Sequence, residues 1–409
     1  MKKTIVILLI MLLILVSGSQ VFAQTQAGVI FLLISPSVQA NSMGGTYANT
    51  VSSDPMASVM NPAYLGFFAQ QNTFGYSDSK TDWLPALVDD ITYQCKSFTG
   101  GYTLKNAPVT IGFGYHQIKM DYGSQYLTFE SGPQIIGPFN SWDEAKIYSY
   151  SALLDYYVRL SIGMNFKSIE SHLIPEDWAN GIEAASAHAM DWGLALQVPV
   201  LQSLSKILHR EFIDDVSPVT PVADLGLSYG HSNIGDKIWY IDPDQADPLP
   251  RNAQAGVNLH LGLKYQSENL NCQIISWQYA WESEGLLVER NPNYEIKYPS
   301  TLWSVDSDKI THKTGWELSM FDFLYLRNGH YKDKQGQVEY DTYGWGVNFI
   351  QFYRMILWFD GRLTGDSVFD KMLDHLDIEY HRSEWRGGLE CLRDRTEFDG
   401  VTVRFTNIF

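Results

Sequence analysis

The sequence comes closest to a catalytic motif at Gly230–Gly235, which reads GHSNIG. A serine between glycines after a strand is the pattern of a nucleophile elbow, but that motif requires the spacing G-x-S-x-G. Here the second glycine, Gly235, follows Ser232 one position too late. A tight turn after Tyr229 explains the histidine, asparagine and glycine without catalysis. We therefore expect no catalytic residue in this chain, and no enzyme.

Metal and redox motifs are also weak. Asp242, Asp244 and Asp247 could gather calcium, but their spacing is not that of an EF-hand, and we favour a solvated acidic loop. The sequence contains no H-E-x-x-H motif and no glycine-rich phosphate loop. Three scattered cysteines, Cys95, Cys272 and Cys391, leave either one disulfide with a free thiol or no disulfide, and we expect none. No metal or cofactor is predicted.

Several charged residues alternate with apolar ones and would share one face of their strands. They are the basic residues Arg159, Lys167, His260 and Lys264, for which Asp191 and Asp224 are candidate acidic partners. Such residues line any polar interior, so we favour a network of ion pairs over a solute-binding site. The net charge of −17 argues against nucleic acid as a partner, because binding it would need a basic surface.

The elements that carry these residues are strands with one apolar and one polar face. In Tyr157–Lys167 apolar residues alternate with polar residues or glycine, so Ile162 and Gly163 point to opposite sides. The pattern returns at Val109–His116, Trp192–Val198 and Val257–Tyr265. A soluble sandwich turns its apolar face inward, whereas a membrane barrel turns it outward, and alternation alone fits both.

The two ends of the chain favour the barrel. Lys2 and Lys3 followed by the apolar run Ile5–Val16 form a secretory signal, for which we predict cleavage after Ala23. At the other end one face carries the apolar residues Val401, Val403, Phe405 and Phe409, as in a strand that the barrel-assembly machinery recognises. We therefore expect a protein of the outer membrane of a Gram-negative bacterium, surrounded by outer-membrane lipid, with Ile162 facing lipid and Gly163 facing the lumen. Ile162→Arg should then impair assembly far more than Gly163→Ser.

The predicted fold class is all-β: a transmembrane antiparallel β-barrel of about fourteen strands in residues 71–409. Aromatic residues make up 14% of the chain, as suits the aromatic girdles of such barrels. Short and long links between the strands alternate, as periplasmic turns and external loops should, and Asp121–Ala145 is one of the links expected to be a long external loop. Two links break this rule, Pro199–Pro221 and Phe352–Asp374, and both have helical spacing, which predicts one or two short periplasmic helices.

Residues 24–70 lack alternation and are predicted to form an N-terminal plug, or hatch, inside the barrel. Met43, Gly44 and Gly45 permit one tight bend, and Asn61 with Pro62 fixes a second. A disordered leader is the alternative, which the apolar residues of this segment disfavour.

Three segments resemble the PorV/PorQ family of outer-membrane proteins, which are related in fold to the fatty-acid channel FadL. Ile34–Leu65 is similar to the family's opening stretch, with its Met-Gly-Gly and Asn-Pro-Ala. Leu225–Leu259 is similar through Asn-x-Gly-x-Lys and Leu-Pro, and Phe321–Phe349 through Leu-Arg-x-Gly. The resemblance implies a FadL-like barrel of fourteen strands with a plug.

The same resemblance implies two functions. PorV-type proteins act in type IX secretion, where they receive secreted proteins by their C-terminal sorting domains and work with other secretion-system components. Barrels of the FadL type instead pass hydrophobic small molecules across the outer membrane. We take the secretion function as the first expectation and the hydrophobic channel as the alternative, because a shared fold does not decide between them.

Overall fold

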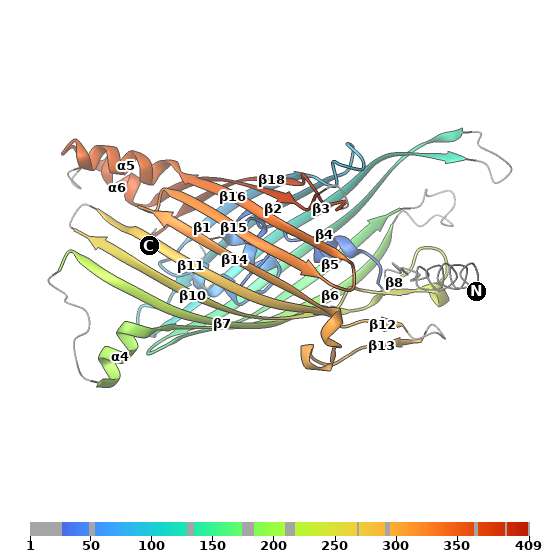
Figure 1. Cartoon of the computed structure of the whole chain (residues 1–409), viewed down its shortest axis with the longest axis horizontal. Helices are drawn as coiled ribbons and strands as arrows, with labels where there is room; N and C mark the ends of the chain where they lie inside the picture. Colours follow the sequence, from blue (N-terminus) through green and yellow to red (C-terminus); the bar gives the residue numbers. More distant parts are fainter. Residues whose placement is uncertain are drawn as a thin grey trace, which may run out of the picture.

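The structure is a computed structural model that describes residues 27–48, 54–128, 135–173, 184–208, 217–267, 270–290, 295–363, 367–388 and 391–407. The predicted signal peptide, residues 1–23, and Phe409 lie outside these residues. In the part of the chain described, fourteen antiparallel strands close into one barrel, with β1 paired to β18 (Figure 1). The predicted fold class is confirmed.

The barrel strands follow one another around the wall in sequence order. They are β1 (Phe74–Asp82), β2 (Thr92–Thr103), β3 (Val109–Thr128), β4 (Ile135–Asp155), β5 (Arg159–His172), β6 (Ala185–Pro199), β7 (Val219–Gly235), β10 (Asn252–Gln266), β11 (Asn271–Leu286), β14 (Ile310–Met320), β15 (Leu324–Asp333), β16 (Val338–Asn348), β17 (Leu376–Arg386) and β18 (Glu397–Phe405).

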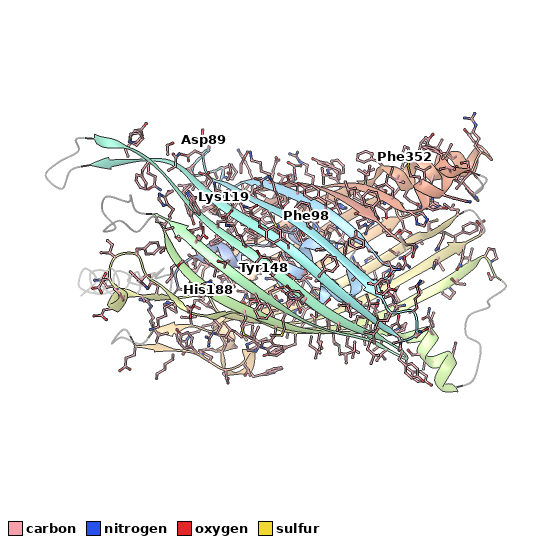
Figure 2. The ribbon with its side chains drawn as sticks, turned by 180° about the vertical axis from the view of Figure 1, so that it is seen from behind. Asp89, Phe98, Lys119, Tyr148, His188 and Phe352 are labelled. Atoms are coloured by element: carbon pink, nitrogen blue, oxygen red, sulfur yellow. The ribbon has the colours of Figure 1, made fainter. Side chains whose placement is uncertain are left out.

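Alternation places the apolar residues on the outside of this wall. Ile162 is 54% exposed, whereas Gly163 faces the lumen. The same outward face carries Phe98 on β2 and Tyr148 on β4, both exposed on the barrel surface (Figure 2). An apolar and aromatic exterior around a lumen with many polar residues is the surface that a β-barrel presents to lipid.

The two ends of the barrel differ in their connections. At one end, the helix end, short turns alternate with α4 (Val200–Leu208) and with the pair α5 (Phe349–Phe359) and α6 (Val368–Asp374). These helices occupy the two links whose spacing predicted them. Among the helices that the structure describes, none has the length and apolar composition needed to cross a membrane.

The opposite end, the loop end, carries the longer connections. Two of them contain short ribbons, β8 (Lys237–Ile238) with β9 (Asp247–Pro248), and β12 (Glu289–Arg290) with β13 (Ile296–Lys297). The short 3-10 helices η3 (Pro243–Gln245), η4 (Leu302–Ser304) and η5 (Ser307–Lys309) lie in the same connections.

One predicted loop is largely strand. Asp121–Ala145 was expected to be a long external loop, but β3 and β4 continue as a paired hairpin beyond the barrel rim. Their alternation fades there because a strand pair outside the lipid needs no apolar face, and the sequence prediction relied on that face.

The N-terminal residues 27–48 and 54–73, called the internal segment below, lie inside the barrel (blue in Figure 1). The segment forms η1 (Ile30–Leu33), α2 (Val38–Asn41), η2 (Pro55–Val59) and α3 (Tyr64–Phe68). Nearly all of its described side chains are buried. Ser37 donates a hydrogen bond to Asp54, which joins the two halves of the segment.

The C-terminal strand β18 completes the wall. Val401, Val403 and Phe405 alternate with the buried Thr402 and Arg404, so the three apolar residues face outward. Asn407 takes a positive φ and donates its N–H to the carbonyl of Gln71 at 2.7 Å. The strand therefore ends before Asn407. Recognition of these residues by the barrel-assembly machinery stays a prediction.

Candidate functional site

The first bend of the internal segment lies directly against three glycines of the wall. Gly44 and Gly45 have φ of +72° and +78°, which glycine adopts without strain. The inward glycines opposite the bend are Gly315 on β14, Gly329 on β15 and Gly344 on β16. A Cβ atom on any of them would collide with Met43, Gly44 or Ser42. We call these three glycines the Gly44 contact site.

A side-chain hydrogen bond fixes this bend to the wall. The N–H of Gly44 donates to Oγ1 of Thr342 at 2.8 Å. Close by, the N–H of Tyr47 donates to the carboxylate of Glu282 at 2.8 Å, and the indole of Trp385 donates to the carbonyl of Asn41 at 3.3 Å. Hydrogen bonds donated from the bend and from the wall therefore hold the bend in place, in addition to its close fit against the three glycines.

The second bend has a matching site on other strands of the wall. Asn61 and Pro62 lie against Gly163 on β5, Gly193 on β6 and Gly230 on β7, the Asn61 contact site. Inside the bend the side chain of Asn61 accepts the N–H of Ala63 at 3.1 Å, an Asx turn. Gly163 faces the lumen as predicted, but a side chain there would strike Pro62, so Gly163→Ser is not the mild change that the sequence suggested.

Wall side chains also donate hydrogen bonds to the backbone carbonyls around this second bend. Asn165 donates to Ser58 at 3.0 Å, and Ser161 donates to Ala63 at 2.6 Å. Met60 accepts from Gln254 at 3.0 Å and from Ser232 at 3.2 Å.

The GHSNIG motif therefore serves this contact. Ser232 binds the internal segment, while His231 stacks on Trp192 with ring centroids 5.0 Å apart. These contacts give the motif a structural role.

The predicted ion pairs form in part. Lys167 and Asp191 are buried and 2.8 Å apart, and Asp191 also accepts the N–H of Asn233 at 2.7 Å. Asp191 lies where the pairing of β6 and β7 shifts register. His260 pairs with Asp224 at 3.1 Å.

The other two predicted basic residues lie outside this network. Arg159 pairs with Asp155 at 3.3 Å, a partner that the sequence had not suggested, and Lys264 has no ion pair in the part of the chain described.

The lumen wall has an apolar side that the sequence did not predict. Many inward residues of β2 to β6 are apolar, interspersed with polar ones such as Asn165, Lys167 and Asp191, and the apolar ones pack against apolar residues of the internal segment. The wall residues include Tyr93, Ile118, Met120, Ala145, Ile147, Leu153, Ile169, Ala187 and Ala189, and the segment residues include Phe31, Met56, Val59, Met60 and Phe67. Barrel interiors are generally polar, so this apolar side stands out.

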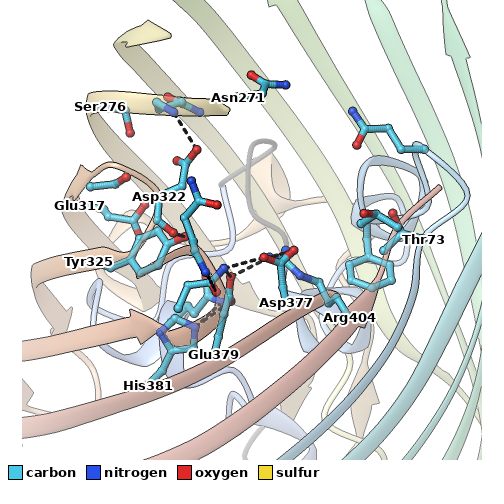
Figure 3. Close-up of a pocket in the computed structure, with 18 of the residues that line it drawn as sticks. Thr73, Asn271, Ser276, Glu317, Asp322, Tyr325, Asp377, Glu379, His381 and Arg404 are labelled. Atoms are coloured by element: carbon cyan, nitrogen blue, oxygen red, sulfur yellow. Dashed lines mark hydrogen bonds and ion pairs between the residues drawn. The ribbon is translucent and has the colours of Figure 1, made fainter. Parts of the chain in front are cut away.

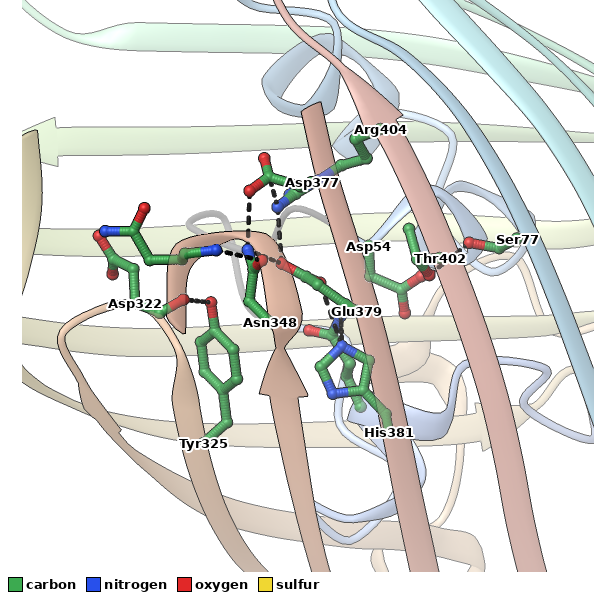
Figure 4. A network of polar contacts seen from close by, with 12 residues as sticks. Asp54, Ser77, Asp322, Tyr325, Asn348, Asp377, Glu379, His381, Thr402 and Arg404 are labelled. Atoms are coloured by element: carbon green, nitrogen blue, oxygen red, sulfur yellow. Dashed lines mark hydrogen bonds and ion pairs between the residues drawn. The ribbon is translucent and has the colours of Figure 1, made fainter. Parts of the chain in front are cut away.

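The opposite side of the lumen holds a polar cavity of about 440 Å³ near the helix end (Figure 3). Residues 67–73 of the internal segment form one side of it, and strands β10 to β18 form the other. Arg404 reaches Glu379 at 2.6 Å and Asp377 at 3.3 Å, and Asn348 donates to Asp377 at 2.7 Å (Figure 4). Arg327 pairs with Glu317. The cavity wall is therefore a connected network of charged groups.

Asp322 lies in the turn between β14 and β15, at the edge of this cavity. Its φ is +54°, and its carboxylate accepts the N–H of Gln273 at 2.7 Å. Burial raises the pKa of Asp322 to about 6; the Gln273 N–H and Arg404 oppose the rise, and Asp377 and Glu379 add to it. No basic side chain pairs with Asp322 within the described residues.

The remaining candidate groups have local partners. Asp242 accepts the N–H of Asp244 at 3.0 Å at the start of η3, and Asp247 pairs with Arg290. Across the described residues no three His, Cys, Asp or Glu side chains are grouped as a metal site would require. The three cysteines are free thiols.

Solved structures that resemble this chain include two toluene transporters and a FadL homologue. The toluene transporter TbuX of Ralstonia pickettii is 12% identical, with 91% of this chain and 98% of that chain covered and a TM-score of 0.44. The toluene transporter TodX of P. putida is 12% identical, with 90% and 98% covered and a TM-score of 0.41. A FadL homologue of Pseudomonas aeruginosa is 9% identical, with 90% and 98% covered and a TM-score of 0.39.

No protein-family model and no curated protein matches the sequence. At these identities and scores the likeness concerns the barrel alone, and the PorV/PorQ resemblance stays a prediction. Function therefore has to come from the geometry of the lumen.

Proposed function

We propose that this protein is an outer-membrane channel for hydrophobic small molecules, closed by its N-terminal segment. The observation that carries the proposal is the cluster of apolar inward residues that β2 to β6 contribute to the lumen wall. A water-filled pore needs polar walls, whereas an apolar solute gains free energy along an apolar one. In the closed protein the internal segment covers this wall.

The internal segment has the contacts expected of a gate. Its two bends rest on glycine backbones, where only a small displacement is needed to break the fit. Many of its anchors are single hydrogen bonds from wall side chains, each worth about 0.5–1.5 kcal/mol net. The segment is therefore stable when all of these hydrogen bonds are formed, and it can leave the wall as they break one after another.

In this proposal the chain is divided at Ala23 and near residue 70. Residues 1–23 are a cleaved signal peptide, residues 24–70 are the plug, and residues 71–409 are the barrel. The helix end, with its short turns, faces the periplasm, and the loop end faces outward.

Deleting Ala40–Pro62 tests the gate. The deletion removes both bends and leaves the barrel strands intact. Purified protein should conduct ions strongly in planar bilayers, and cells should take up a monoaromatic or long-chain probe faster than cells with the intact protein. A deleted protein that assembles but stays as closed as the parent would refute the gate, and open conductance without faster uptake of any hydrophobic probe would refute the solute class.

A second function, cargo handling in type IX secretion, is favoured by one observation at the loop end. Trp303 is 79% exposed there, and Tyr298 and Ile241 are also exposed on the folded connections. Exposed aromatic side chains on ordered loops suit protein binding. Purification of the protein from outer membranes should then recover secreted proteins with C-terminal sorting domains or components of the secretion system, and Trp303→Ala should reduce that recovery. Equal recovery with Trp303→Ala, or none from a host that secretes such proteins, would argue against it.

A further inference from the structure

The polar cavity near the helix end has an excess of negative charge. The described residues that line it include the carboxylates of Glu317, Asp322, Asp374, Asp377 and Glu379 and the guanidinium groups of Arg327, Arg354 and Arg404. Each guanidinium already contacts a carboxylate: Arg327 contacts Glu317, Arg354 contacts Asp374, and Arg404 bridges Asp377 and Glu379. Among the described residues Asp322 has no ion pair, although the charge of Arg404 acts on it, and Asp377 shares Arg404 with Glu379.

Buried polar atoms around the same cavity have no partner among the described residues. Gln278 is only 5% exposed, and its amide nitrogen donates to Glu317 at 2.9 Å, so its carbonyl oxygen is the end left unbonded. Ser319 is 3% exposed, and its hydroxyl is also unbonded. Gln273, whose backbone N–H donates to Asp322, also has an unbonded side-chain oxygen. Buried polar groups are normally hydrogen-bonded, so these oxygens indicate a ligand that donates hydrogen bonds.

The chemistry of these groups defines the ligand. An ammonium group carries one positive charge and three hydrogen-bond donors and accepts none, which matches a carboxylate surrounded by amide and hydroxyl oxygens. We propose that this cavity binds a short linear diamine, with one ammonium group on Asp322 and the other toward the carboxylate pair of Asp377 and Glu379. Figure 3 shows these side chains arranged around the same space.

This site goes beyond the proposed channel. The cavity lies on the polar side of the lumen, whereas the proposed hydrophobic path follows β2 to β6. Binding of a diamine can therefore be measured in the closed, full-length protein, whatever solute the channel carries.

Isothermal titration of the full-length protein in detergent tests the site, with putrescine as the probe. Putrescine should bind, and 1,4-butanediol, which has the same length without charge, should bind at least tenfold more weakly. Asp322→Asn keeps an oxygen that can accept the Gln273 N–H, so the turn should be retained while affinity for putrescine falls at least tenfold. Ser319→Ala, which removes the unbonded hydroxyl and leaves the other described contacts of the cavity in place, should lower affinity about threefold.

Asp308→Asn is the matched control, because Asp308 is an exposed carboxylate at the loop end. It should leave binding unchanged. The proposal is overturned if putrescine gives no binding, if Asp322→Asn binds as tightly as the parent, or if butanediol binds equally well. Retention of the folded, heat-modifiable band on unboiled gels shows that each variant is assembled.

Discussion

Substituting Gly329 by alanine should release the first bend of the internal segment and open the channel. Gly329 lies in the Gly44 contact site, and a Cβ atom there would meet the backbone N of Gly44, the backbone C of Met43 and the carbonyl oxygen of Thr314, the last at 2.7 Å. All three are backbone atoms and cannot rotate away as a side-chain end could. Thr314 belongs to the barrel wall, which is held by its ladder of hydrogen bonds, so it is Met43 and Gly44 of the bend that have to withdraw.

The size of the effect follows from that displacement. Non-bonded atoms prefer about 3.5–4 Å, and the backbone N of Gly44 and C of Met43 would lie far closer than this to the added Cβ, so the bend has to move by more than about 1 Å. The hydrogen bond from Gly44 to Thr342, 2.8 Å long, is then lost. Losing a buried hydrogen bond costs about 1–3 kcal/mol, and an overpacked contact costs about 1–3 kcal/mol. Even about 2 kcal/mol shifts the ratio of closed to open protein by about 30-fold.

Single-channel recording in planar bilayers measures this ratio directly. Gly329→Ala should show openings at least about tenfold more often than the parent. Gly137→Ala is the control, because a Cβ at Gly137 on β4 has no atom within 4 Å. If Gly329→Ala assembles and remains as closed as the control, the bend does not close the channel.

Three further substitutions and conditions test other parts of the structure. Ile162→Arg places a charge on the lipid-facing side of β5 at a cost of about 2–4 kcal/mol, and should reduce the folded, heat-modifiable fraction in outer membranes; normal amounts would mean that this face does not contact lipid. Lys167→Met leaves Asp191 buried without its cation, so the free energy of unfolding should fall by about 3–5 kcal/mol in a urea titration of the folded barrel. An unchanged midpoint would mean that the pair is not buried in solution. Burial raises the pKa of Asp322 to about 6, so putrescine binding should be constant above pH 7. Below pH 6 the affinity should fall about tenfold per pH unit, because the carboxylate gains its proton. Calorimetry that shows no change between pH 7 and 5 would exclude Asp322 as the anchor.

Much of the barrel could be predicted because lipid imposes a strict pattern. Alternation in Tyr157–Lys167 and its repeats gave the strands, the direction of Ile162 and Gly163, and the number of strands. The helical spacing after Pro199 and Phe352 gave the two helical links. The hairpin of β3 and β4 was missed because strands beyond the lipid lose the pattern on which the prediction rests.

The candidate site could be predicted only in part. Met43-Gly44-Gly45 and Asn61-Pro62 were identified as bends from their backbone preferences, which are local. The glycines that receive them come from six strands, and which glycines face each bend depends on strand register, which sequence alone does not give. Glycines at the inward positions of the alternating strands were the sequence feature that could have indicated these contact sites. The polar cavity joins residues from β10 to β18 with residues 67–73, so no single stretch of sequence reveals it.

The place where the barrel closes has a consequence for how the protein assembles. The first strand, β1, pairs with the last, β18, and the internal segment touches both: Ser79 of β1 donates to the carbonyl of Pro36 at 2.9 Å, and Val38 lies against Gly400 of β18. Joining the two ends of a long chain is opposed by loop-closure entropy. A segment that holds both strands in register lowers that kinetic barrier, so the residues that shut the finished pore also act as an intramolecular template. Removing them should slow refolding into detergent more than it weakens the folded barrel.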